Sequence, residues 1–163
     1  MQKRQFINMV SGAMLTGVSG LVRAQGAGTP GVTDREIKIG STGPLSGPAA
    51  GYGIVGKTMS AWFDLVNAEG GVNGRQLKLV LADDGYSPPK TLEQSRRLVE
   101  RDQVAFLAAQ IGSSTGLASR SYLNNAKVPQ LFVSSGSATW LDDAAKFPWS
   151  MGWLPLYTDE GRA

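Results

Sequence analysis

The sequence predicts an α/β fold, a three-layer sandwich in which helices cover both faces of a mostly parallel central sheet. Segments of strand length alternate along the chain with segments whose apolar residues recur at helical spacing. Residues 104–109 are almost all apolar, as expected of a parallel strand that is covered on both faces. With 163 residues and 21 glycines, the chain has the length of one domain and enough glycine for many turns.

The first half of this pattern begins with a strand at 36–40, where apolar and polar residues alternate with a period of two. A loop rich in glycine and proline follows at 41–53. Residues 54–68 have the spacing of an amphipathic helix that ends at a pair of glycines, and a second strand is expected at 77–82. We expect one buried stripe on the helix, made of Val55, Met59, Trp62, Phe63 and Val66.

The second half continues the alternation. Ser87, followed by proline, predicts a helix start, because a hydroxyl can cap a helix and proline is favoured in its first turn. The remaining elements are expected at 104–109 (strand), 115–126 (helix), 129–133 (strand), 147–153 (strand) and 158–160 (helix start). In a parallel sheet, ligands bind beyond the carboxyl ends of the strands. Four loops are therefore expected there, at 44–53, 83–87, 112–115 and 134–139.

Residues 1–24 predict an export signal. Lys3 and Arg4 precede a weakly apolar stretch, and Val22-Arg23-Ala24 offers a small-residue cleavage site. The alternative, an ordinary amphipathic helix, is disfavoured by three glycines, each of which costs about 1 kcal/mol relative to alanine. We expect cleavage after Ala24, by either the Sec or the twin-arginine route, and a flexible, glycine-rich leader at 25–35.

Composition excludes several classes of protein. The chain has no cysteine, so it forms no disulfide and carries no lipid on a cysteine. Beyond the signal, 13 basic and 13 acidic residues remain, and this neutral body offers no basic stripe that could follow a nucleic-acid backbone. We expect a soluble periplasmic protein that binds no nucleic acid and does not insert into the membrane after signal removal.

The segment QIGSSTG, residues 110–116, admits two chemistries. Its G-x-S-x-G pattern, with a strand before it and a helix after it, matches a hydrolase elbow with Ser114 as the nucleophile. A serine nucleophile needs a base, however, and the chain has no histidine. A secreted serine hydrolase is therefore kept only as an alternative.

The second chemistry is anion binding. Free N–H groups at a helix start attract negative charge, and the hydroxyls of Ser113, Ser114 and Thr115 would add donors there. The simpler alternative is that one hydroxyl only caps the helix. A second hydroxyl cluster, residues 134–137, follows the adjacent strand. Two such loops at one edge predict a shared anion, such as a carboxylate.

Three stretches carry a family resemblance: IKIGSTGPLSGPAAGYG, VNAEGGVNGRQLKLVLADDGYSPPK and VPQLFVSSGSATW. Residues 36–163 resemble the branched-chain amino-acid type (type I) of periplasmic solute-binding protein, which serves ATP-driven (ABC) importers. The family implies two α/β lobes that close on a ligand. By this resemblance the chain is the N-terminal ligand-binding lobe, truncated, with the second lobe absent.

The resemblance also implies site residues. The ligand carboxylate would be held by Ser113 or Ser114, by the backbone of Ser135 and by the Ser137 hydroxyl, with Tyr52 bordering the pocket. The alternatives are a helix cap for Ser113, a turn for Ser135 and surface packing for Tyr52. No cofactor or metal is implied. Asp83 and Asp84 are interpreted as a turn and strand-end pair. Tyr86 and Ile111 stand where some members have a disulfide.

The segment KFPWSMGWLPLY resembles members that take up aromatic acids, and Trp140, Trp153 and Tyr157 could form stacking walls or equally fill the core. The sequence thus predicts a non-enzymatic substrate-binding component that delivers a small carboxylate, a branched-chain amino acid or an aromatic acid, to a membrane permease. A lone lobe should bind weakly or not at all. A ligand-sensing regulator on the same fold is a further alternative, although an export signal argues against a cytoplasmic one.

Overall fold

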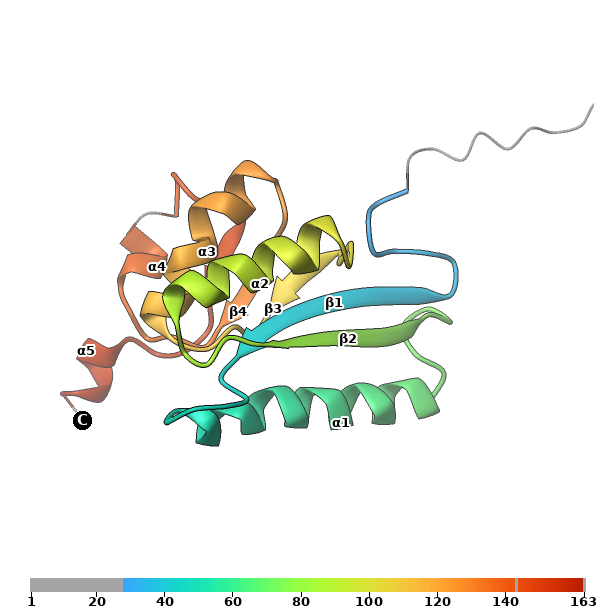
Figure 1. Ribbon diagram of the computed structural model, residues 1–163, viewed down its shortest axis with the longest axis horizontal. Helices are drawn as coiled ribbons and strands as arrows, with labels where there is room; N and C mark the ends of the chain where they lie inside the picture. The colour runs from blue at the N-terminus through green and yellow to red at the C-terminus, as the bar shows by residue number, and fades with distance from the viewer. Residues whose placement is uncertain (1–27, 143, 163) are drawn as a thin grey trace, which may run out of the picture.

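The computed structural model describes residues 28–142 and 144–162, and these form a single parallel sheet with helices on both faces (Figure 1). Five strands lie in the order β2-β1-β3-β4-β5, and each neighbouring pair is parallel. The strands are β1 (Glu36–Gly43), β2 (Gln76–Asp83), β3 (Phe106–Ala108), β4 (Gln130–Val133) and β5 (Ser150–Gly152). The three-layer α/β prediction is confirmed.

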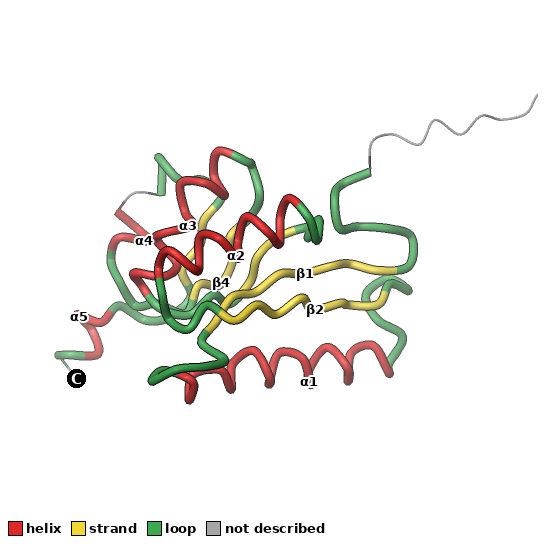
Figure 2. Tube along the Cα trace, in the orientation of Figure 1, coloured by secondary structure: helices red, strands yellow, loops and turns green. Residues whose placement is uncertain are grey.

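Three longer helices make the outer layers. Helix α1 (Ile54–Ala68) lies on one face of the sheet, while α2 (Pro88–Glu100) and α3 (Ser113–Asn125) lie on the other, as Figures 1 and 2 show. The short elements are η1 (Ala50–Gly53), α4 (Thr139–Asp142) and α5 (Tyr157–Glu160). The loops that follow the first strands gather at the end of the sheet nearest α5 (Figure 2). This is the carboxyl edge at which the sequence places a ligand.

The core lies between the sheet and the α2–α3 layer. It is formed by Ala82, Leu98, Val104, Leu107 and Leu123, which are at most 3% exposed. Burying a side chain such as leucine contributes roughly 1.5–3 kcal/mol, so this cluster fixes α2 and α3 on the sheet.

The bounds expected for α1 are correct, but its buried stripe is wrong. Trp62 is 61% exposed, and the other four predicted stripe residues are only half-buried. The helix lies against β2, where Gly56 permits a close approach: a Cβ atom there would lie 2.7 Å from Leu81 Cδ2. Because β2 is an edge strand, only part of the apolar face of α1 meets the sheet. Helical spacing identifies the apolar face but not what covers it.

Other differences are local. Strand β3 occupies only 106–108 of the expected 104–109, and α3 begins at Ser113 instead of 115. Ser87 takes the position before α2, yet its side chain makes no capping hydrogen bond. Proline at the first helical position, whose missing N–H costs nothing there, is the start signal that remains.

The predicted leader is partly ordered. The Lys38 N–H donates to the Gly31 carbonyl at 2.7 Å, and Val32 pairs with Ile37. Gly31 has a φ of +73°, and a Cβ atom there would lie 2.2 Å from the Ala105 nitrogen. Residues 29–33 are therefore held against the sheet, whereas the sequence predicted a flexible leader there. The predicted signal, residues 1–24, lies outside the described residues. Within the described ranges, every helix is too short or too polar to cross a bilayer.

Candidate ligand-binding site

The two hydroxyl-rich turns meet at the carboxyl edge. Ile111 pairs with Ser134 in a parallel bridge beyond the ends of β3 and β4. The Ser134 N–H donates to the Gln110 carbonyl at 2.9 Å, and the Gly112 N–H donates to the Ser134 carbonyl at 3.2 Å. The pairing extends past the regular strands and fixes one turn beside the other, as the sequence predicts.

The side chains of these turns touch. The hydroxyl oxygens of Ser113 and Ser135 lie 2.7 Å apart, and either can donate. Ser135 is 2% exposed, and its oxygen also accepts the Ser137 N–H at 3.2 Å. Each hydroxyl carries one hydrogen, so while one serine donates to the other, the second serine has its hydrogen free for an anion; both hydrogens reach the same anion only if the bond between the serines breaks.

Helix α3 begins inside the first turn, with Gly112 immediately before it at φ 98° and ψ 151°. The first helical bond runs from the Gly116 N–H to the Gly112 carbonyl at 3.1 Å. The N–H groups of Ser113, Ser114 and Thr115 precede that bond and have no intrahelical acceptor. No side chain caps this end of the helix, so the alternative in which a serine serves as a cap is wrong. These N–H groups give the turn a partial positive charge.

The other predicted residues lie in different settings. The Thr115 hydroxyl is buried and donates to the Ile111 carbonyl, so only its N–H belongs to the helix start. Ser114 is exposed. The Ser137 hydroxyl donates to Thr139 Oγ1 at 3.2 Å. Tyr52, on η1, is 63% exposed at the rim.

A cavity of about 290 Å³ lies beside the paired turns. Its lining consists of Tyr52, Val55, Tyr86, Ile111, Gly112, Ser134, Leu154 and Tyr157. Sequence reasoning missed Val55, Tyr86, Ile111 and Leu154 as lining residues. Tyr86 lies in the 83–87 loop, whose place at this edge was predicted, but it was considered only as a position at which some family members have a disulfide.

Tyr86 is held by its neighbours in an uncommon conformation. Its φ is +61°, which is costly for a residue with a side chain. Asp84, which is fully buried, accepts the Tyr86 N–H and the Thr91 hydroxyl, each at 2.9 Å. The tyrosine ring lies against Gly112, where a Cβ atom would be 2.7 Å from the Tyr86 hydroxyl oxygen. The role of Asp84 is therefore to position this loop.

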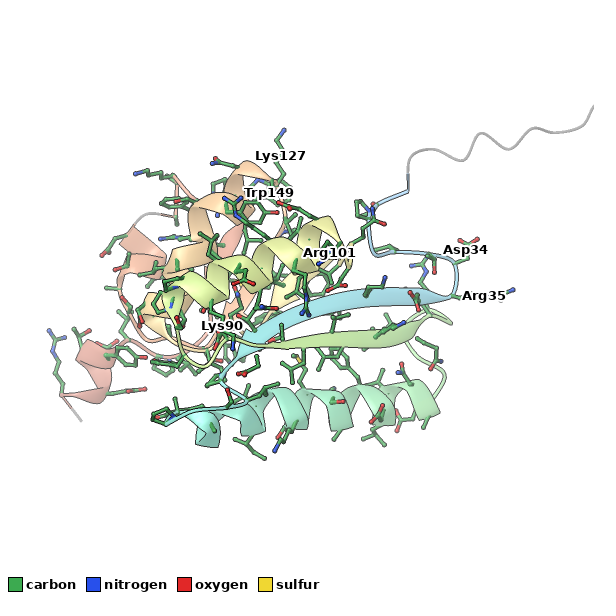
Figure 3. The ribbon with its side chains drawn as sticks, in the orientation of Figure 1. Asp34, Arg35, Lys90, Arg101, Lys127 and Trp149 are labelled. Carbon is green, nitrogen blue, oxygen red and sulfur yellow. The ribbon has the colours of Figure 1, made fainter. Side chains whose placement is uncertain are left out.

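Asp83 organises the first loop of the edge. It accepts the Leu45 N–H at 2.9 Å, the Ser46 hydroxyl at 2.6 Å and the Gly85 N–H at 3.0 Å. Lys90 adds an ion pair at 3.4 Å, and Figure 3 places it beside the carboxyl ends of β1 and β2. The Ser46 hydroxyl above all, with the Gly85 N–H, holds the pKa of the Asp83 carboxyl well below its ordinary range. Asp83 thus serves as a turn residue.

A buried polar network supports the start of α3 from below. Gln130 Nε2 donates to the Gly116 carbonyl at 2.9 Å and to Gln110 Oε1 at 2.7 Å. Gln110 Nε2 donates in turn to the Thr42 hydroxyl at 2.8 Å. Both glutamines are at most 1% exposed, and the network ties three strands to the helix that carries Ser113. The sequence signal was two glutamines next to apolar strand segments: Gln130 opens β4, and Gln110 follows the end of β3.

The structure places the three aromatic residues that could form stacking walls in three different environments. Trp140 is 2% exposed and lies 4.9 Å from the Arg120 guanidinium, so it is a core residue. Trp153 is 66% exposed and contacts Phe132 edge-on at 5.5 Å, away from the cavity lining. Only Tyr157 lines the cavity.

The nucleophile alternative finds no support in this geometry. Among the described residues, Ser114 has no hydrogen bond to a side chain that could act as its base, and the sequence has no histidine. The same ranges hold no group of three or more acidic side chains placed to bind a metal.

Known proteins provide an independent comparison. A family model described as periplasmic binding protein matches residues 36–163. An amino acid binding protein of Pseudomonas aeruginosa is 36% identical over 91 residues, which cover 53% of this chain and 24% of that protein. The leucine-, isoleucine-, valine-, threonine-, and alanine-binding protein of the same organism is 35% identical over 80 residues, 48% of this chain and 21% of its own length. The chain therefore matches about a quarter or less of each relative.

Comparison with solved structures supports the same family. A possible leucine/isoleucine/valine-binding protein from Rhodopirellula baltica superposes with a TM-score of 0.70 at 27% identity, covering 77% of this chain and 33% of its own. The resemblance found in the sequence is confirmed: the chain belongs to the periplasmic binding protein family.

Proposed function

We propose that this chain is a ligand-binding lobe of the substrate-binding component of an ABC importer. Residues 1–24 would direct export to the periplasm, 25–35 would form a leader, and 36–163 would hold a small carboxylate for delivery to a membrane permease. The binding proteins for branched-chain amino acids among its relatives support this class of ligand. No bond is made or broken in this function.

The observation that carries the proposal is the contact between Ser113 and Ser135 at 2.7 Å, beside the free N–H groups of α3. One hydroxyl hydrogen of the bonded serine pair and the N–H groups of the helix start then remain for an anion beside the cavity, and such an arrangement stabilises negative charge without any arginine. The Ser135 N–H donates to the Val133 carbonyl at 2.9 Å and the Ser137 hydroxyl to Thr139 Oγ1 at 3.2 Å, so each would exchange that partner for the ligand to complete the cradle. Tyr52 would border it.

The lobe alone should bind weakly, because it leaves half of the ligand in water. Micromolar binding by this chain would refute that part of the proposal. Ligand-observed NMR detects millimolar dissociation constants and suits the experiment.

The test compares benzoate with benzamide, which has the same ring but no negative charge. We expect benzoate to bind about tenfold more tightly or better, since hydrogen bonds to a charged group contribute roughly 1.5–3 kcal/mol. Ser113→Ala and Ser135→Ala should each remove most of that preference. Ser121→Ala, an exposed position on the same helix, is the matched control. Equal binding of acid and amide would overturn the carboxylate site, and labelling of Ser114 by a fluorescent phosphonate would favour a hydrolase.

A further inference from the structure

Helix α1 carries a second, largely apolar stripe on the side away from the sheet. The stripe consists of Ile54, Thr58, Ala61, Leu65 and Ala68, and all five are exposed. Successive members are alternately four and three residues apart, which is the spacing of a seam between two paired helices. Figure 1 shows α1 along one border of the molecule, with no other described element on its outward side.

This surface is unusually apolar for one that faces water. Ile54 is 60% exposed, Leu65 is 50% exposed, and Trp62, which flanks the stripe, is 61% exposed. A groove of about 800 Å³ runs along the flank that carries Trp62, and it is lined by Ile54, Val55, Thr58, Met59, Trp62 and Trp153. Contiguous exposed apolar surface of this kind marks a site of interaction with another molecule.

The charges on the opposite flank indicate which molecule fits. Lys57 and Asp64 are the two charged residues of α1, and both are exposed. They are seven residues, close to two helical turns, apart, so they lie on the same flank of the stripe. A second α1 that runs antiparallel to the first sets each Lys57 beside Asp64 of the other copy. Because a two-fold axis relates the copies, both ion pairs form at once.

The apolar residues match in the same antiparallel register. Ile54 comes opposite Leu65 of the second copy, and Leu65 comes opposite Ile54 of that copy. In the middle of the stripe, Thr58 and Ala61 come opposite each other, and their small side chains let the two helices approach closely. Charged and apolar contacts are thus self-complementary in one register, which is the property that a two-fold interface requires.

The groove receives a large side chain in this register. Trp62 of the second copy comes beside Val55, which lines the groove together with Trp153. An indole buries more apolar area than any other side chain, so this contact removes from water much of the surface that α1 leaves exposed.

We infer that α1 is a self-association surface, on which two copies of this chain pair through antiparallel α1 helices. The helix has 15 residues and is therefore about 22 Å long, so the interface is small and the dimer is weak. The chain should be monomeric at low micromolar concentrations and should dimerise as the concentration approaches about a millimolar.

Sedimentation equilibrium of the full chain over this range measures the dissociation constant of the dimer. Lys57→Glu and Asp64→Lys each place like charges opposite one another twice per dimer, and each should raise the dissociation constant about fivefold or more. The double variant, Lys57→Glu with Asp64→Lys, restores both ion pairs with reversed sign and keeps the net charge of the parent. Its dissociation constant should return to within about twofold of the parent's.

Lys127→Glu is the matched control, because it changes the net charge by the same amount as Lys57→Glu. Lys127 is exposed and lies on the side of the molecule away from α1 (Figure 3). This variant should dimerise like the parent, whereas Leu65→Glu, which puts a charge into the apolar seam, should abolish dimerisation. Circular dichroism shows whether each variant is folded, and rescue by the double variant excludes loss of folding as the cause.

The outcomes are distinct. A dimer that Lys57→Glu weakens and the double variant restores supports the inference. A chain that stays monomeric up to about a millimolar overturns it and assigns the α1 face to a different partner. Association that is unchanged by both Lys57→Glu and Leu65→Glu overturns it as well, because it then arises on another surface. None of these results depends on the ligand, so the inference stands apart from the proposed function.

Discussion

The hydroxyl oxygens of Ser113 and Ser135 lie 2.7 Å apart, although the residues are 22 positions apart in the sequence. They meet because β3 and β4 are parallel neighbours whose pairing extends to Ile111 and Ser134. The turns after both strands are thereby fixed at one edge of the sheet.

Gly112→Ala should destabilise the chain and distort the site. At φ 98° and ψ 151° only glycine is comfortable, and the new Cβ atom would lie 2.6 Å from Thr115 Oγ1. We expect a loss of about 2–4 kcal/mol in the free energy of unfolding, measured by urea denaturation. Gly51→Ala, where a Cβ atom meets nothing within 4 Å, is the control and should change stability by less than about 1 kcal/mol. Similar losses for both variants would show that the turn is not constrained as described.

Asp83 should contribute stability that depends on pH. Its pKa is lowered in the folded state, chiefly by the Ser46 hydroxyl, so its contribution is fully present above the ordinary aspartate pKa of about 3.9. That contribution is lost as the pH falls through the lower, folded-state pKa. Asp83→Asn should therefore be less stable than the parent at pH 7, and the difference should shrink below about pH 4.

The midpoints of urea denaturation, measured from pH 2 to pH 7, report the difference in stability between Asp83→Asn and the parent. Asp64→Asn, an exposed change on α1, is the control and should run parallel to the parent. A constant gap between Asp83→Asn and the parent across the whole range would contradict the assignment.

Gln130→Leu should weaken the support of α3. Leucine removes the Gln130 donor from the Gly116 carbonyl and from Gln110 Oε1, and the single Ser119 hydroxyl that also reaches both can satisfy only one of them. We expect a cost of roughly 1–3 kcal/mol for the group left unsatisfied. Denaturant unfolding measures the loss, and Gln76→Leu at an exposed strand position should change stability by no more than about 0.5 kcal/mol. An unaffected or more stable Gln130→Leu variant would mean that an apolar core serves as well there.

Trp62→Gln should cost little in this chain, because the side chain is 61% exposed. We expect less than about 1 kcal/mol in unfolding free energy, against roughly 2–5 kcal/mol for Leu98→Ala in the core. Trp62 also lies in an apolar groove with Ile54, Met59 and Trp153, so the variant should bind less of a hydrophobic dye. A loss of about 3 kcal/mol or more in unfolding free energy is typical of a buried tryptophan and would show that Trp62 is buried, as the sequence predicted.

The periodicity of apolar residues, together with the glycines and prolines that end or begin elements, predicted most of the fold. The bounds of α1 and the order of strands and helices followed from apolar spacing, glycines and the Ser87–Pro88 start. Burial on α1 could not be predicted in this way, because it depends on the position of β2 at the edge of the sheet. As a result, Trp62 is exposed although apolar spacing predicted that it would be buried.

The site was predictable to the level of its loops. Parallel topology placed the turns carrying Ser113 and Ser135 at one edge, and the structure brings them into contact. Which side chains face the cavity depends on single dihedral angles, such as the positive φ of Tyr86, and on local bonds, such as the one that occupies the Thr115 hydroxyl. No spacing rule encodes such details, which explains why Tyr86 was missed as a lining residue and why the sequence could not decide between the core and a stacking wall for Trp140.

The most direct test of the central claim is a ¹H–¹⁵N NMR titration of the chain with benzoate, which maps where the carboxylate binds. The account predicts that the largest amide shifts fall together on Ser113, Ser114 and residues 135–137, and that benzamide at equal concentration leaves them nearly unmoved. Shifts confined to the opposite end of the sheet, around Lys127 and Trp149, or a response from one serine turn without the other, would contradict it.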